Sequence, residues 1–88
     1  MEIRYLSSFS KDLKKIKNKE IIAQIEKSIN DIKIDKDIRQ IKNLKKLKGH
    51  NFAYRIRIKD FRIGIFIENN IVEFVRVLPR KDIYESFP

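Results

Sequence analysis

The feature that most constrains the fold of this 88-residue chain is a change of hydrophobic period near its middle. Over residues 9–32 the apolar side chains recur every three or four positions, which is typical of helices with one buried face. From Phe52 onward they alternate with polar residues, which is typical of strands with one buried face. Both patterns fit into one short domain, residues 1–88. The sequence therefore predicts an α+β fold in which two helices pack on one face of a small antiparallel sheet.

The first half predicts a short N-terminal strand over residues 2–6 and then two helices. Ser7, Ser8 and Ser10 are candidate N-caps of the first helix, and Asn18 separates it from the second. The apolar residues of the two helices are Phe9, Leu13 and Ile16, then Ile21, Ile22, Ile25, Ile29 and Ile32. We interpret the second set as core, because such a stripe on one helix face is typical of packing on a sheet. Residues 34–49 fit either a helical turn or an irregular connection.

The second half predicts three strands and a short C-terminal helical turn. If Lys59-Asp60 is a two-residue hairpin loop, the facing pairs are Ile58 with Phe61, Ile56 with Ile63, Tyr54 with Ile65, Arg57 with Arg62, and Arg55 with Gly64. Residues 71–78 are almost all apolar, which favours a central strand covered on both faces. Pro79 would end that strand, and residues 80–87 are enough for one helical turn.

The charge balance narrows the classes of partner. The chain has 21 Lys and Arg against 12 Asp and Glu, a formal charge of +9, so nucleic acid or an acidic protein would relieve its self-repulsion. It has no Cys and one His, which argues against disulfides, a thiolate zinc site or a His-rich metal site. We expect no metal and no cofactor. No stretch is long and apolar enough for a membrane span, and no signal peptide is visible, so we expect a cytoplasmic protein.

Arginines gather on the polar face of the predicted hairpin. Arg57 would face Arg62, with Arg55 beside them, and like charges directly opposed destabilise a bare sheet. A bound anion would compensate, and phosphate suits guanidinium forks best. Because no metal-binding carboxylate pair accompanies these arginines, the pattern favours phosphodiester chemistry without a metal. The alternative is neutralisation by Asp60, Glu68 or Glu73.

Further candidates surround this face. Arg80 and Tyr84 follow the last strand and could close the site; Tyr84 would either stack on a base or fill the core beside Phe87. His50 has a suitable pKa for a general base, but a turn or solvated role fits its position better. The lysines assigned to RNA binding are Lys42, Lys45, Lys46, Lys48, Lys59 and Lys81; for the first four, an ordinary solvated face is the simpler interpretation.

Three segments resemble the RelE/ParE superfamily of toxin–antitoxin toxins. Residues 54–65, YRIRIKDFRIGI, resemble its hairpin signature, residues 77–88, VLPRKDIYESFP, resemble the C-terminal signature of its RelE branch, and residues 9–16 resemble its first helix. The resemblance implies a toxin that enters the ribosomal A site and cuts mRNA by attack of a ribose 2′-OH on the adjacent phosphate. It also implies a cognate antitoxin protein that covers this surface.

The resemblance also implies roles for single residues. Arg57 and Arg62 would clamp the scissile phosphate, Arg55 would assist the 2′-oxygen, Arg80 the leaving 5′-oxygen, and Tyr84 would stack on a codon base. In RelE itself a lysine taken as the general base stands where this chain has Arg55, and arginine cannot readily accept a proton at neutral pH. The acid and base therefore stay open among Lys59, Lys81, His50 and Tyr84.

Two other functions are compatible with the sequence. A ParE-like toxin would inhibit DNA gyrase by binding it, although the ending at residues 80–88 favours the nuclease. An inactive member would act only as an antitoxin partner or co-repressor.

Overall fold

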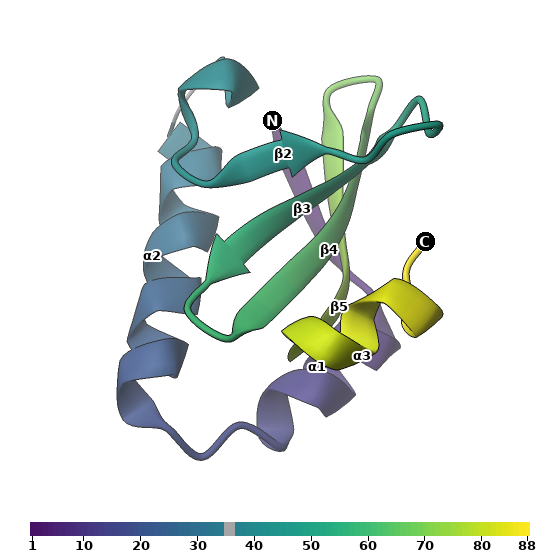
Figure 1. The fold of residues 1–88 in the computed structure, drawn as a ribbon. Coiled ribbons are helices and arrows are strands. Elements are labelled where there is room, and N and C mark those ends of the chain that lie inside the picture. The colour runs from purple at the N-terminus through teal and green to yellow at the C-terminus, as the bar shows by residue number, and fades with distance from the viewer. Residues whose placement is uncertain (35–36) are drawn as a thin grey trace.

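The computed structural model describes residues 1–34 and 37–88; residues 35 and 36, within the stretch that the sequence left open, lie outside the described residues. In chain order the elements are β1 (Glu2–Tyr5), α1 (Ser7–Lys14), α2 (Lys19–Ile34), the 3-10 helix η1 (Ile38–Gln40), β2 (Leu44–Lys46), β3 (Ala53–Ile58), β4 (Phe61–Glu68), β5 (Ile71–Pro79) and α3 (Arg80–Ser86). This is the predicted α+β architecture (Figure 1).

The strands form one five-stranded sheet in the order β1-β5-β4-β3-β2. Its pairs are antiparallel except β1 with β5, which is parallel, so the sheet is mixed rather than purely antiparallel. The predicted hairpin register is confirmed at all five pairs, including Arg57 opposite Arg62 and Arg55 opposite Gly64. β5 is an internal strand, as predicted, and ends at Pro79.

Two details of the predicted elements are wrong. Residues 44–46 form the edge strand β2 rather than part of a helical turn or irregular connection. Three residues are too few to display an alternating pattern, so the sequence carried no signal for this strand. The C-terminal helix α3 is also longer than the single turn expected, since it spans seven residues.

The main core lies between the sheet and the two long helices. Phe9 of α1 and Ile21, Ile25 and Ile32 of α2 are buried against β-strand residues such as Ile56. A second, smaller core lies where α3 crosses the opposite face of the sheet, and Figure 1 shows α3 in front of β4 and β5. Because one face is covered by α1 and α2, functional polar side chains are left to the face that carries α3.

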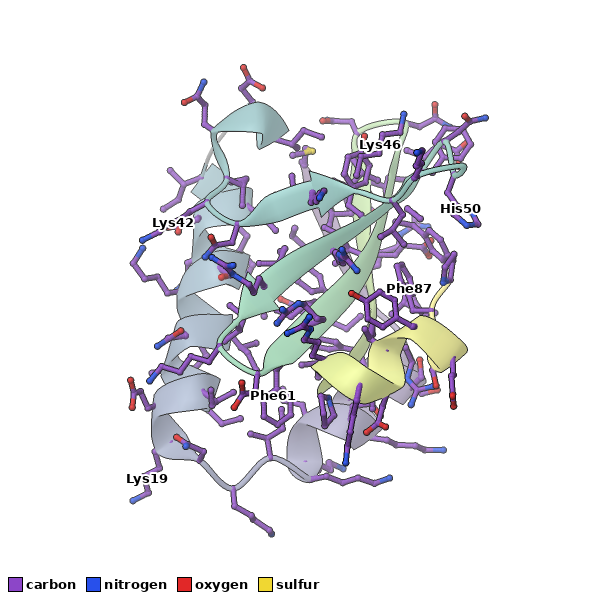
Figure 2. All side chains as sticks on the ribbon, viewed as in Figure 1. Lys19, Lys42, Lys46, His50, Phe61 and Phe87 are labelled. Carbon is purple, nitrogen blue, oxygen red and sulfur yellow. The ribbon has the colours of Figure 1, made fainter. Side chains whose placement is uncertain are left out.

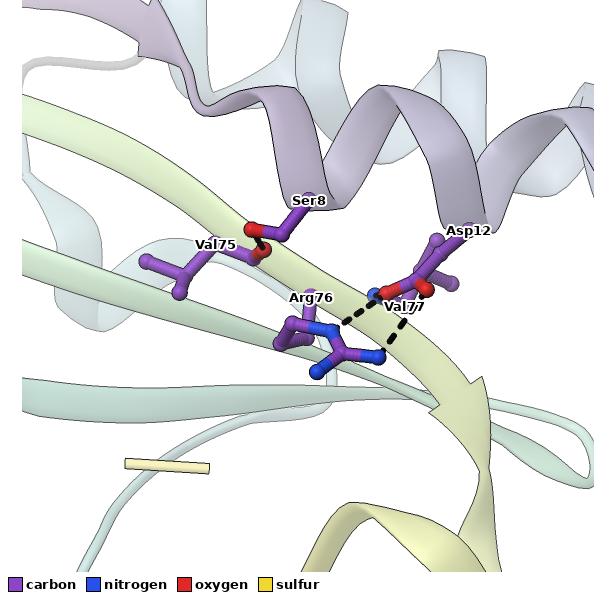
Figure 3. Close-up of polar contacts among 5 residues, drawn as sticks. All are labelled: Ser8, Asp12, Val75, Arg76 and Val77. Atoms are coloured by element: carbon purple, nitrogen blue, oxygen red, sulfur yellow. Dashed lines mark hydrogen bonds and ion pairs between the residues drawn. The ribbon is translucent and has the colours of Figure 1, made fainter. Parts of the chain in front are cut away.

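The N-cap residue Leu6 and two side chains of α1 complete the edge of β5 where β1 stops. The Leu6 amide donates to the Phe74 carbonyl at 3.0 Å, and the Ser8 hydroxyl donates to the Val75 carbonyl at 2.6 Å. Asp12 then accepts a hydrogen bond from the Val77 amide at 3.1 Å (Figure 3). These contacts satisfy strand groups that would otherwise be unpaired, which fixes α1 against the sheet.

The serines predicted to cap α1 do not do so. Leu6 occupies the N-cap position without a side-chain cap, while Ser7, Ser8 and Ser10 lie inside the helix. For α2 the prediction of a break at Asn18 is confirmed, since its side-chain oxygen accepts hydrogen bonds from the Glu20 and Ile21 amides. Within residues 1–34 and 37–88, no helix has the length and apolar character needed to cross a membrane.

Candidate functional site

A groove of about 470 Å³ lies on the polar face of the sheet, between β2, β3, β4 and the start of α3. We call it the arginine groove. It is lined by Asn43, Leu44, Lys45, Arg55, Arg57, Arg62, Arg80 and Tyr84. All five residues that the sequence predicted to be catalytic therefore line one hollow. Their roles in catalysis remain predictions.

Local backbone structure brings these side chains together. Arg55 and Arg57 alternate along β3 with core residues, so both project from the face opposite the core. Antiparallel pairing places Arg62 of β4 directly opposite Arg57. Arg80 reaches the same place because its amide donates to the Asp60 carbonyl at 2.7 Å, which ties the start of α3 to the β3–β4 turn.

Arg62 is the most constrained of the four arginines. Its Nη1 donates to the carbonyls of Lys59 and Phe61, each at 2.8 Å, so the guanidinium is fixed by the backbone of the turn. Burial, followed by the nearby charge of Arg80, lowers the pKa of Arg62 from its ordinary value, and Arg57 and Arg55 contribute in the same direction. The groove is therefore a place where positive charge is crowded.

No carboxylate neutralises this crowding in the part of the chain that the structure describes. The ion pairs found there are Arg4–Glu2, Lys27–Asp31, Lys59–Glu20 and Arg76–Asp12, and none involves a groove arginine. Glu68 and Glu73, expected as alternative partners, line a different hollow. An anion entering the groove would supply the missing charge.

Tyr84 stands at the side of the groove rather than in the core. Its side chain is 60% exposed, and the Arg55 guanidinium carbon lies 5.2 Å from the centre of its ring. A hydrogen bond with Arg55, together with the charge of that residue, lowers the pKa of the Tyr84 phenol. The exposed part of the ring, away from Arg55, is available to stack on a base, and the lowered pKa makes its hydroxyl more acidic than that of an ordinary tyrosine.

Phe87 lies in the core, whereas Tyr84, for which the sequence left a core position beside Phe87 open, does not. Phe87 is 5% exposed, and its ring centre lies 5.2 Å from that of Phe66 in β4. A Cβ atom at Gly64 would lie 2.5 Å from the Phe87 Cγ. Gly64 therefore makes room for Phe87.

The six predicted RNA-binding lysines are scattered. Lys45 lines the arginine groove, Lys81 lines a hollow next to it, and Lys46 lines a third hollow beside Tyr54. Lys59 forms an ion pair with Glu20 at the start of α2. Lys42 and Lys48 line none of these hollows, and Figure 2 shows Lys42 and Lys46 at separate places on the surface.

His50 lies away from the groove. It lines a hollow of about 380 Å³ together with Arg4, Glu68 and Glu73, at another part of the sheet (Figure 2). Of the four candidate proton-transfer groups that the sequence offered, Tyr84 alone lines the arginine groove among the described residues. Within that part of the chain, no group of three or more His, Cys, Asp or Glu side chains is arranged to hold a metal ion.

Sequence reasoning missed the pair Asp12–Arg76. Asp12 is 5% exposed and accepts hydrogen bonds from Arg76 Nε at 2.7 Å and Nη2 at 3.1 Å (Figure 3). The hydrogen bond to Asp12 raises the pKa of Arg76. The available signal was an acid three residues after Phe9, on the apolar face of the predicted helix. This pair joins α1 to β5 and lies outside the groove.

The sequence matches a known protein family. Residues 3–84 match the family described as ParE toxin of type II toxin-antitoxin system, parDE. The chain is 38% identical, over the full length of both, to Toxin RelE3 of Methanocaldococcus jannaschii.

Solved structures share the fold. A chain in the RelB–RelE antitoxin–toxin complex from Methanococcus jannaschii superposes with a TM-score of 0.83 at 34% identity, covering 97% of this chain and 99% of that one. A chain in the archaeal RelE–RelB complex from Pyrococcus horikoshii has a TM-score of 0.74 at 16% identity, covering 92% of this chain and 96% of that one. A chain of the YoeB dimer from Staphylococcus aureus has a TM-score of 0.71 at 19% identity, covering 86% of this chain and 92% of that one.

Proposed function

Because this chain belongs to the RelE/ParE superfamily of toxins from type II toxin–antitoxin systems, on its RelE branch, we propose that it is an endoribonuclease toxin that cuts mRNA in the ribosomal A site. The observation that carries this proposal is the arginine groove. Four guanidiniums line it without a carboxylate partner among the described residues. Such a site suits the negative charge that builds up on a phosphate under attack.

The proposed reaction is a transfer at one phosphodiester. The ribose 2′-oxygen loses its proton and attacks the adjacent phosphorus, while the bond to the 5′-oxygen breaks and that oxygen takes up a proton. The products are a 2′,3′-cyclic phosphate and a 5′-hydroxyl end. Arg57 and Arg62 would hold the non-bridging oxygens, Arg55 would approach the 2′-oxygen, and Arg80 the leaving oxygen.

Fixed donors make this arrangement effective. The Arg62 guanidinium is already positioned by two turn carbonyls, and the backbone of Arg80 is held by its hydrogen bond to Asp60. Groups that need no rearrangement stabilise a transition state better than mobile ones. The ribosome would hold the RNA in line for attack, which supplies the orientation that this small protein does not provide alone.

Tyr84 is our candidate for proton transfer as well as for base stacking. The guanidinium of Arg55 lowers its pKa, so more of the phenolate is present at a given pH than for a free tyrosine. An arginine cannot readily serve as the base, because its own pKa is too high. Of the other candidates, His50 lines a separate hollow, Lys59 forms an ion pair with Glu20, and Lys81 lines the adjoining hollow rather than the groove itself.

We also propose a cognate antitoxin as partner and the cytoplasm as the site of action. Two of the structures that resemble this chain are complexes of a RelE toxin with a RelB antitoxin. A formal charge of +9 would favour an acidic partner that covers the groove until the toxin is released.

The experiment that tests the proposal incubates the purified protein with ribosomes programmed with a defined mRNA and maps the new 5′ ends. We expect cuts inside the A-site codon, and no cut when the nucleotide before the cut carries a 2′-deoxy ribose. Cutting that does not depend on the 2′-hydroxyl would contradict the mechanism.

A second function is favoured by one observation, because the matching family model is named for the ParE toxins. A ParE-like protein would bind DNA gyrase instead of cutting RNA. A supercoiling assay with purified gyrase, run beside the ribosome assay, separates the two. Inhibition of gyrase without mRNA cutting would establish this alternative.

A further inference from the structure

A second hollow adjoins the arginine groove on the side of α3. It measures about 460 Å³ and is lined by Asp60, Pro79, Arg80, Lys81 and Tyr84. Arg80 and Tyr84 line both hollows. An RNA strand with one phosphate in the groove would therefore have the space for a neighbouring base next to it, with the ring of Tyr84 as the shared wall.

Asp60 is the unexpected residue of this second hollow. It is exposed, and its carboxylate has no hydrogen bond or ion pair within residues 1–34 and 37–88, although Arg80 and Lys81 line the same hollow. Its backbone is fixed, because its carbonyl accepts the Arg80 amide at 2.7 Å. The structure thus places an unpaired carboxylate, on a fixed stretch of backbone, beside a cationic groove.

The negative charge of the Asp60 carboxylate determines which part of an RNA can bind beside it. A carboxylate repels phosphate and accepts hydrogen bonds but donates none. Its natural ligand in an RNA is the edge of a base that carries donors. Guanine alone presents two adjacent donors, N1–H and the N2 amino group, which match the two carboxylate oxygens. Cytosine and adenine offer one amino group beside an acceptor, and uracil one N–H between two acceptors.

We infer that this second hollow binds the base adjoining the cut and that Asp60 selects guanine there. The inference rests on the proposed function, since it takes the RNA strand from that proposal. Tyr84 and the ring of Pro79 provide apolar surface for a base of any kind, and stacking alone does not distinguish bases strongly. Asp60 is thus a specificity-determining residue, and the groove arginines act on any sequence.

The test compares wild type with Asp60→Asn on ribosomes programmed with mRNAs that differ in one base beside the cut. The asparagine keeps the backbone carbonyl that holds α3, but replaces one acceptor oxygen with a donor. A good bidentate contact to a base edge discriminates against bases that lack the matching donors. We expect the ratio of cutting at guanine to cutting at uridine to fall about tenfold, with the rate at uridine little changed. Asp82→Asn is the matched control, since Asp82 lies in α3 outside this hollow.

The experiment distinguishes failure of this inference from failure of the proposed function. If wild type cuts but Asp60→Asn keeps the guanine preference, or if wild type shows none, the inference is wrong. If wild type does not cut at all, the proposed function fails. Binding of short 2′-O-methyl RNAs with guanine or uracil at one position then decides the inference: equal affinities overturn it, and a guanine preference lost in Asp60→Asn supports it.

Discussion

Two regions of this molecule use the same guanidinium group in opposite ways. At the junction of α1 and β5, Arg76 is paired with the buried carboxylate of Asp12, and its pKa is raised. In the arginine groove, Arg62 has no carboxylate partner among the described residues, and its pKa is lowered by burial and then by the charge of nearby arginines. The first arrangement stabilises the fold, whereas the second is stable only at a cost that a bound anion would offset.

This contrast teaches where to look for function in a small basic protein. Net charge alone does not separate an RNA-binding surface from a solvated one, and of the six lysines predicted to bind RNA, all of them in the described part of the chain, Lys45 alone lines the arginine groove. A charged group that the fold has satisfied belongs to the structure. A group that the fold fixes in place but leaves without a counter-charge is prepared for a ligand.

The largest effect should come from removing the fixed guanidinium of the groove. We expect Arg62→Ala to slow mRNA cutting on programmed ribosomes by about 10²–10³-fold, as for loss of one transition-state donor. Its thermal unfolding should match that of wild type, because the change relieves repulsion in the groove. A folded variant that cuts at the wild-type rate would contradict the claim that the unpaired Arg62 serves function rather than the fold.

The junction should respond in the opposite way. We expect Arg76→Ala to lower the free energy of unfolding by about 3 kcal/mol, because it leaves the buried Asp12 carboxylate without its cation. Denaturant unfolding measures this. Cutting per folded molecule should be nearly unchanged. Loss of cutting in protein that remains folded would place Arg76 in the functional machinery instead.

The titration of Tyr84 sharpens the comparison within the groove. Arg55 lowers the pKa of this phenol from its ordinary value of 10.0, so Arg55→Gln should move it back upward. With Tyr5 and Tyr54 replaced by Phe, ultraviolet titration follows Tyr84 alone.

The lowered pKa of Tyr84 also makes stability depend on pH. The pKa of the Tyr84 phenol is lower in the folded protein than in the unfolded chain. Its interaction with Arg55 therefore stabilises the fold fully above the unfolded pKa, and this stabilisation is lost as the pH falls through the folded pKa. If Tyr84 is the base, the pH at which cutting reaches half its maximum should rise in Arg55→Gln. An unchanged titration would mean that the two side chains do not interact in solution.

The smallest effect concerns the ion pair between Lys59 and Glu20, which are both about half exposed. We expect Lys59→Glu alone to destabilise the protein by about 0.5 kcal/mol, and the double change with Glu20→Lys to restore stability. The double variant should also cut mRNA as wild type does. If Lys59 contacts RNA instead, the double variant would remain impaired, because the carboxylate introduced by Lys59→Glu would repel the phosphates.

The sequence was most informative where side-chain period decides structure. The register of the β3–β4 hairpin, and with it the position of Arg57 opposite Arg62, followed from alternation and a two-residue turn. The same reasoning placed Arg55 beside this pair, whereas Arg80 and Tyr84 were included because they follow the last strand; the structure has all five in one groove.

What could not be predicted depends on contacts between distant segments. The strand β2 is too short to have a pattern, and its pairing with β3 exists only once the sheet has formed. Asp12 is a polar residue on an apolar helix face, and its partners Arg76 and Val77 lie 64 and 65 positions away. The choice for Tyr84 between stacking on a base and filling the core beside Phe87 was open, because an aromatic residue in a short terminal segment suits both.

The central claim is that the arginine groove holds the phosphates of RNA, and the salt dependence of binding tests it most directly. The affinity for a short single-stranded 2′-O-methyl RNA is measured over a range of salt concentrations for wild type, Arg62→Gln and Arg4→Gln. Arg4 is the matched control, since it pairs with Glu2 and lines another hollow. The account predicts that Arg62→Gln reduces the slope of log affinity against log salt by about 0.7, the loss of one phosphate contact, while Arg4→Gln leaves it unchanged. Equal slopes for all three proteins would contradict it.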